Sequence, residues 1–241
     1  DKAMFLTLPT FDTYLNGLSA AAGVEITNFR DMLAALELRL QFFRQTTGTT
    51  VSDNGIPHFT WADYTQEEIE EIFRKARSNA PLTEREVDQY QSAFLFEMAC
   101  LYKRNGYVMQ LHIGTYLDAN TKGVRLVGQS TGFDCTDDQC AVTSVGELLN
   151  RLTLAGELPK TILYPLDGTK IETWAVLAAG FAADGETNGI RGKVQLGAPW
   201  WFNDQQFGIA RQFSACANLY PISLSVGMLT DSRSFISYPR H

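Results

Sequence analysis

An aspartate and an arginine lie two residues apart near the end of this chain, directly after a short apolar run. The run covers residues 224–229, and Asp231 and Arg233 follow it. A run of this length that contains glycine predicts a strand buried on both faces. Parallel sheets carry their chemistry at strand ends, where Asp231 could bind a metal or accept a proton and Arg233 could grip a carboxylate. The alternative is an ion pair that only ties a loop.

Three earlier segments show the same combination of an apolar strand with polar or aromatic residues at its end. They are residues 107–114, 161–166 and 193–201. Helical apolar spacing follows at 144–154, 170–182 and 204–219. Alternating strands and helices predict an α/β protein with a parallel sheet. We expect about four βα units, half of a (β/α)8 TIM barrel, with an open doubly wound sheet as the alternative.

The first hundred residues differ because their pattern predicts helices without intervening strands. Helical spacing covers 10–22, 28–44, 65–77 and 83–104. Thr65 with Glu68 and Thr83 with Glu86 form capping boxes that begin the last two of these helices. Residues 46–61 predict a loop. The expected organisation is a helical insertion over 1–104 before the half barrel over 105–241, together forming one structural domain.

The strand at 107–114 carries His112 near its end, at the same edge of the sheet as Asp231 if both strands belong to one barrel. Histidine and aspartate are frequent metal ligands. A single histidine on an apolar strand is also common as a hydrogen-bonded core residue. Two ligands do not complete a metal site.

Several segments together resemble the uronate isomerases, the glucuronate isomerase family of the amidohydrolase superfamily. The similar segments are 106–114 (GYVMQLHIG), 118–120 (DAN), 131–134 (TGFD), 158–164 (LPKTILY), 192–204 (GKVQLGAPWWFND) and 227–238 (GMLTDSRSFISY). Weaker matches occur at 1–3 and 52–55. The resemblance implies a distorted (β/α)8 barrel enzyme of the cytoplasm that acts in sugar-acid catabolism. Its reactions would convert D-glucuronate to D-fructuronate and D-galacturonate to D-tagaturonate.

The same resemblance assigns roles to the matched residues. His112 and Asp231 would be catalytic and would bind a divalent metal, zinc in the family pattern. Arg233 would hold the substrate carboxylate.

The resemblance also implies a sugar pocket. Trp200 and Trp201 would line it, since flat aromatic rings pack well against a sugar ring. Asp53 matches a loop aspartate of the family that approaches the substrate. The alternative for the two tryptophans is that they are bulky core residues at the end of a strand.

The chain departs from the family pattern at its metal ligands. It has three histidines, His58, His112 and His241, so it lacks the His-x-His pair that the superfamily places on its first strand. Asn54 stands where the family usually has histidine, and Leu117 or Asp118 where it has arginine. We therefore expect a fragment that is the second half of the barrel and lacks the N-terminal part. Its open edges favour a homo-oligomer or association through the half-barrel edges. The competing hypothesis is a catalytically incomplete fragment, or a relic that binds sugar acids without catalysis.

The composition of the chain indicates which classes of partner to expect. With 27 acidic and 20 basic residues the net charge is −7, which argues against a nucleic-acid surface. The sequence shows no signal peptide and no long apolar run, so we expect no membrane partner. Of the four cysteines only Cys135 and Cys140 lie close together; they could hold zinc or form a disulfide, but reduced cytoplasmic thiols are the expectation.

Overall fold

The computed structural model describes residues 2–137, 139, 141–183, 192–229 and 235. The chain divides into two compact units that interleave in sequence. The first contains Asp1–Asn54, Phe59–Met109 and Thr143–Pro159, and the second contains Gly55–His58, Gln110–Val142 and Lys160–His241. Within the described part, no helix is long and apolar enough to cross a bilayer.

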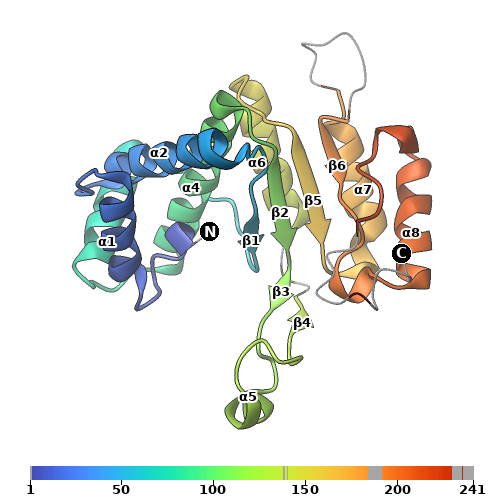
Figure 1. The fold of residues 1–241 in the computed structure, drawn as a ribbon, viewed down its shortest axis with the longest axis horizontal. Helices are drawn as coiled ribbons and strands as arrows, with labels where there is room; N and C mark the ends of the chain where they lie inside the picture. The colour runs from blue at the N-terminus through green and yellow to red at the C-terminus, as the bar shows by residue number, and fades with distance from the viewer. Residues whose placement is uncertain (1, 138, 140, 184–191, 230–234, 236–241) are drawn as a thin grey trace. The chain divides into compact units, whose positions relative to one another are not determined.

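The first unit is helical (Figure 1). Its elements are η1 (Lys2–Met4), α1 (Phe11–Ala22), α2 (Phe29–Thr47), α3 (Gln66–Arg77), α4 (Glu84–Asn105) and most of α6 (Val142–Leu154). The four helices predicted in the first hundred residues are confirmed. Both predicted capping boxes form, because Thr65 and Thr83 accept hydrogen bonds from the backbone N–H groups of Glu68 and Glu86. Asn28 and Asp31 form a third capping box, on α2.

Aromatic rings make the core of the first unit. Phe73 of α3 is fully buried and lies edge-on to Phe11 of α1 and Phe29 of α2. Phe29 also meets Tyr90 of α4, whose hydroxyl donates a hydrogen bond to the carbonyl oxygen of Ala3 at 2.7 Å. The apolar stripes of the helices therefore meet in one cluster.

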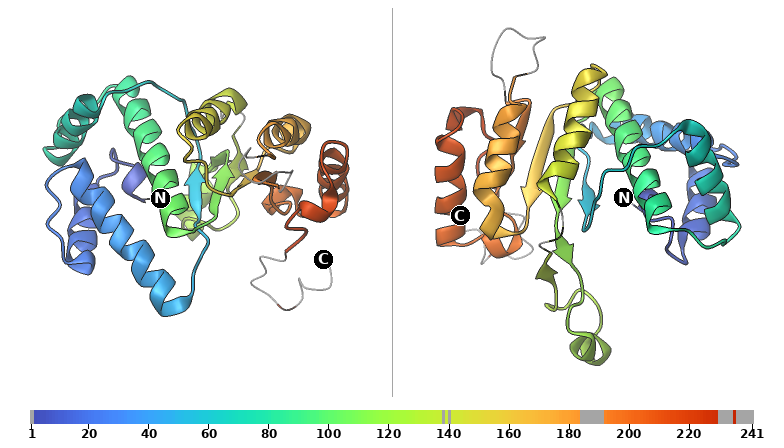
Figure 2. Two further views of the ribbon diagram at one scale, coloured as in Figure 1. Left: turned by 90° about the horizontal axis from the view of Figure 1, so that it is seen from above. Right: turned by 180° about the vertical axis from the view of Figure 1, so that it is seen from behind.

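A four-stranded sheet organises the second unit. Figure 1 labels its strands, and Figure 2 shows the chain from two further sides. Its strand order is β1-β2-β5-β6, with β1 at Asn54–Ile56, β2 at Met109–Ile113, β5 at Thr161–Pro165 and β6 at Val194–Leu196. β5 and β6 are parallel. Helix α7 (Ile171–Gly180) packs on both, and α8 (Gln206–Ala217) packs on α7. The predicted α/β class with a parallel sheet is confirmed.

The two faces of the sheet differ in chemistry. Along β2 the burial alternates: Leu111 and Ile113 are fully buried, whereas Gln110 and His112 are half-buried on the opposite face. The same alternation in β6 buries Val194 and Leu196 and leaves Gln195 half-buried. One face is therefore apolar, and the other carries the polar and aromatic groups of the candidate site.

An excursion after β2 was not predicted. It consists of β3 (Thr115–Tyr116), α5 (Thr121–Val127) and β4 (Cys135–Thr136), with β3 and β4 antiparallel. Strands of two residues show no hydrophobic period, which is why the sequence pattern does not reveal them. The short strand β1 was missed for the same reason, since it lies within the segment 46–61 that predicted a loop.

The predicted strand at 224–229 is wrong within the described residues. Instead η4 (Ile222–Leu224) is a single 3-10 turn, and residues 225–229 have no regular structure. The physical reason is visible at Val226, whose N–H donates to the side-chain oxygen of Gln195 at 2.8 Å rather than to a neighbouring strand. The predicted strand at 193–201 is shorter than expected, because Trp201–Asn203 forms the 3-10 turn η3.

Candidate active site

His112 lies at the C-terminal end of β2 between two aromatic rings. Its imidazole stacks on the ring of Tyr164 from β5, with centroids 4.6 Å apart and an interplanar angle of 14°. Trp200, which follows β6, meets the same imidazole at 4.6 Å and 62°. Side chains from β2, from β5 and from the segment after β6 therefore meet at one point, as is common at the carboxyl ends of parallel strands.

Tyr164 is fixed on both sides. Its hydroxyl donates a hydrogen bond to Oε1 of Gln110 at 2.6 Å. Its ring covers Gly197 so closely that a Cβ on that glycine would overlap the ring atoms. Glycine at position 197 therefore permits the ring of Tyr164 to lie against this part of the backbone while it stacks on His112.

Trp200 and Trp201 form a continuous aromatic surface. Their ring centroids are 4.7 Å apart, and Phe202 continues the cluster at 6.2 Å from Trp201. Trp201 has a positive φ of 47°, which is a strained conformation for a large side chain. Its side chain is 41% exposed, so an aromatic surface faces solvent beside His112. A flat apolar surface next to a polar group suits a sugar ring.

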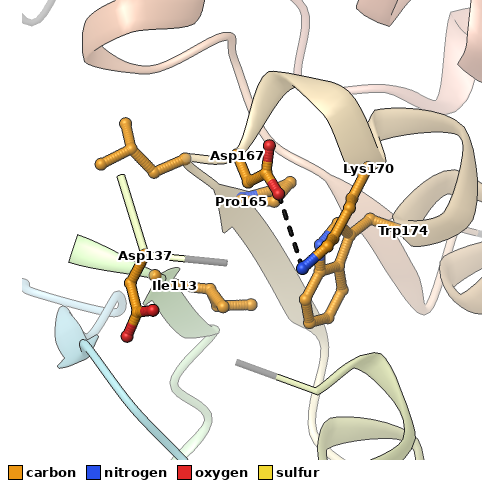
Figure 3. A pocket seen from close by; sticks show the side chains of 8 residues that line it. Ile113, Asp137, Pro165, Asp167, Lys170 and Trp174 are labelled. Carbon is orange, nitrogen blue, oxygen red and sulfur yellow. Dashed lines mark ion pairs between the residues drawn. The ribbon is translucent and has the colours of Figure 1, made fainter. Parts of the chain in front are cut away.

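A second group of polar residues lines a small pocket at the ends of β2 and β5 (Figure 3). Asp167 is only 7% exposed and accepts hydrogen bonds from the hydroxyl and the backbone N–H of Thr169 at 2.6 and 2.9 Å. Lys170 Nζ lies 3.5 Å from the other carboxylate oxygen. Burial alone would raise the pKa of Asp167, but the Thr169 bonds and the Lys170 charge outweigh it and hold that pKa below its ordinary value.

The structure places the predicted site residues in three groups. It brings His112, Trp200 and Trp201 into one cluster. Asp53 is exposed and belongs to the first unit. Asp231 and Arg233 lie outside the described residues.

Sequence reasoning missed Tyr164 and Gln110 as members of the cluster. Both stand on the half-polar face of strands that the sequence did predict. A signal was available, since Tyr164 occurs near the end of a predicted strand, as His112 does.

The described residues offer few donor side chains for the predicted metal. Among the described residues, no three His, Cys, Asp or Glu side chains are arranged to hold a metal ion. Of the two predicted ligands the described part contains His112, which is one donor where a stable site needs three or four. These residues by themselves do not fit a metal centre. Cys135 is an exposed free thiol, and Cys140 lies outside the described residues.

The sequence model of the glucuronate isomerase family matches residues 1–241, the whole of the chain. The chain belongs to this family. The uronate isomerase of Shouchella clausii is 42% identical over 241 residues, which are 100% of this chain and 50% of the relative. The resemblance predicted from the motifs is therefore confirmed.

Solved structures agree with the sequence comparison. The uronate isomerase of Thermotoga maritima superposes with a TM-score of 0.86 at 26% identity, covering 98% of this chain and 50% of that one. The glucuronate isomerase of Caulobacter crescentus gives a TM-score of 0.83 at 26% identity, covering 100% of this chain and 48% of that one. The chain thus spans about half the length of the relatives that it matches.

Proposed function

We propose that this chain supplies part of the active site of a uronate isomerase. The reaction would convert an aldo-uronate into its keto form, D-glucuronate to D-fructuronate or D-galacturonate to D-tagaturonate. The observation that carries the proposal is the contact of His112 with Trp200 at the carboxyl ends of the strands, in a chain of this family. This contact supports the proposal because an imidazole, which can transfer a proton, lies against an aromatic ring of the kind that packs on a sugar.

The chemistry requires few groups. Aldose–ketose isomerisation removes the proton from C-2 and returns a proton to C-1, while the hydroxyl proton passes from the oxygen on C-2 to the oxygen on C-1. A base, a group that shuttles the hydroxyl proton and stabilisation of the enediolate are needed. We assign proton transfer to Asp231 and His112, which are the ionisable residues matched to the family at the strand ends.

Substrate binding falls to the other matched residues. The rings of Trp200 and Trp201 would pack against the sugar, and Arg233 would hold the carboxylate through its planar fork. Asp53 would approach the substrate from a loop. Asp231 and Arg233 carry these roles by family resemblance.

We further propose that the site is completed by residues that this sequence does not contain. A half barrel would hold His112 and Asp231 as two ligands of a divalent metal, zinc by family pattern, and the remaining ligands would come from the rest of the barrel. Such an arrangement predicts self-association or pairing with a complementary half. A monodisperse monomer in light scattering would count against self-association.

The test is isomerisation of D-glucuronate and D-galacturonate by the purified chain, with and without added zinc or manganese. Asp231→Asn should abolish any turnover, because amide nitrogen cannot accept a proton as the carboxylate does. Asp63→Asn is the matched control. Asp63 lies in the first unit and makes an exposed ion pair with Arg151, so its loss should leave turnover unchanged.

The competing function is a catalytically incomplete fragment or relic that binds sugar acids. The departures that favour it are the missing His-x-His pair and the absence of three convergent metal donors among described side chains. Titration calorimetry with D-glucuronate decides between them. Binding of D-glucuronate without turnover would support the relic if Arg233→Met abolishes that binding. The absence of both binding and turnover would contradict both proposals for this chain by itself.

A further inference from the structure

Asn203 is a buried polar residue at the end of η3, two residues after the Trp201 that carries the positive φ. Its side chain is 6% exposed. The amide nitrogen Nδ2 donates hydrogen bonds to the carbonyl oxygens of Pro165 and Leu166 at 3.3 and 3.0 Å. Both acceptors are backbone groups at the end of β5, so the side chain of Asn203 joins the segment after β6 to the segment after β5.

The backbone of Asn203 also shapes the aromatic turn. Its N–H donates to the carbonyl oxygen of Trp200 at 3.0 Å, and the next N–H, from Asp204, donates to the carbonyl oxygen of Trp201 at 3.0 Å. These bonds close the 3-10 turn around the positive φ of Trp201. The turn that presents the two indoles thus begins at Trp200 and is anchored at Asn203.

The other end of the connection reaches the strand of His112. The N–H of Leu166, whose carbonyl oxygen Asn203 contacts, donates to the carbonyl oxygen of Ile113 at 2.9 Å. Ile113 is the residue after His112. A short path of hydrogen bonds therefore runs from the turn of Trp200, through Asn203 and Leu166, to the backbone beside His112.

Two glycines lie close to Asn203. A Cβ on Gly168 would meet Oδ1 of Asn203 at 2.5 Å, and a Cβ on Gly208 would overlap the backbone oxygen of Asn203. Neither glycine has a positive φ, so the space around Asn203 rather than backbone conformation requires glycine there. Gly168 therefore makes room for the side-chain amide of Asn203, and Gly208 makes room for its backbone carbonyl.

We propose that Asn203 is a positioning residue that sets the ring of Trp200 against the imidazole of His112 by tying the turn after β6 to the end of β5. The proposal rests on the proposed function only in taking this cluster as the active site. The hydrogen bonds and the ring contact themselves stand without it. Asn203 need not touch the substrate, because it acts through Trp200.

Proton NMR of the histidine rings tests this without requiring activity. The chain has three histidines, so His112 can be assigned by its loss in His112→Gln. Trp200→Leu removes the neighbouring indole and defines the shift that this ring causes at His112. Asn203→Asp keeps the shape but turns a donor into an acceptor facing two carbonyls. Gly168→Ala adds a methyl group that would overlap Oδ1 of the same amide.

We expect Asn203→Asp and Gly168→Ala to move the His112 resonances in the direction seen in Trp200→Leu, while the resonances of exposed His58 stay in place. Gln205→Ala is the matched control. The Gln205 side chain accepts from the N–H of Phe207 at the start of α8 and does not bond to β5, so its loss should not move the His112 resonances. Circular dichroism establishes folding for each variant.

A folded Asn203→Asp variant with unchanged His112 resonances overturns the proposal. If that variant does not fold, Gly168→Ala decides in its place by the same criterion. The outcome is also separate from the isomerase test. If the parent chain is active but Asn203→Asp leaves the His112 resonances unchanged, only the positioning role is rejected. If the parent chain is inactive but Asn203→Asp moves those resonances, the positioning role stands and only the catalytic proposal is rejected.

Discussion

The α3–α4 region of the first unit and the turn at residues 197–203 of the second unit are built by different means. Helices α3 and α4 begin at capping boxes whose partners are three residues apart, at Thr65 and at Thr83. The turn depends on residues far away in sequence. Tyr164 lies over Gly197, and Asn203 bonds to the carbonyls of Pro165 and Leu166.

This difference affects what a mutation does. A capping bond in α4 can be removed at the cost of one local interaction, because the rest of the helix is held by its packing. The turn lacks the repeated backbone hydrogen bonds of a helix, so its conformation depends on a few close contacts. We expect substitutions of similar size to cost more in the turn than at a helix start.

Gly197→Ala should have the largest effect. The added methyl group overlaps the ring of Tyr164, and overpacking of this kind costs about 1–3 kcal/mol. Urea denaturation followed by tryptophan fluorescence measures the loss in free energy of unfolding. Gly180→Ala at the end of α7 is the control, since a Cβ there meets no atom within 4 Å. Equal effects of the two substitutions would break the comparison.

Thr83→Ala should have an intermediate effect. It removes the acceptor for the N–H of Glu86 at the start of α4, a loss of about 1 kcal/mol. Thr10 occupies the same position before α1 but makes no side-chain capping bond, so Thr10→Ala provides a matched control. Urea denaturation followed by far-UV circular dichroism should separate the two variants. The local account fails if Thr10→Ala is as costly as Thr83→Ala.

The smallest effect should be a dependence on pH at Asp167. Because the pKa of Asp167 is lowered in the folded state from its ordinary value of 3.8, the carboxylate adds stability at neutral pH. That stability is lost as the pH falls below the ordinary value and through the folded pKa. Asp167→Asn removes the charge that faces Lys170 and should be less stable than the parent at pH 7.

Urea midpoints of the parent and Asp167→Asn at several pH values between neutral and strongly acidic check this expectation. The difference between them should shrink as the solution becomes acidic. A difference that stays constant with pH would show that the Asp167 charge contributes nothing and that only the shape of the side chain matters.

Helix positions were predictable because their signals are local. Capping residues and apolar spacing located α3 and α4 within a residue or two. The strands β2 and β5 were also found, since each is an apolar run long enough to recognise. β1 and the excursion from β3 to β4 were missed because strands of two or three residues form only where a partner strand is already in place. The strand predicted at 224–229 was wrong because an apolar run forms a strand only when it pairs with another strand, and this run pairs with none in the part of the chain that the structure describes.

The candidate site was predictable in part. His112, Trp200 and Trp201 were named from motifs of the family, and the structure brings them together. Tyr164 was not named, because stacking on His112 depends on strand order. Asn203 was not named either, because a buried amide that bonds to two distant carbonyls leaves no trace in local spacing.

The sequence by itself determined the helices of the first unit, the α/β class, the family and three residues of the aromatic cluster. These follow from local spacing and from motifs in consecutive residues. Only the tertiary structure decided which face of the sheet carries the cluster, the close contact of the Tyr164 ring with Gly197 and the hydrogen bonds of Asn203. The physical reason is that packing and buried hydrogen bonds join groups far apart along the chain, and their geometry exists only once the strands lie side by side.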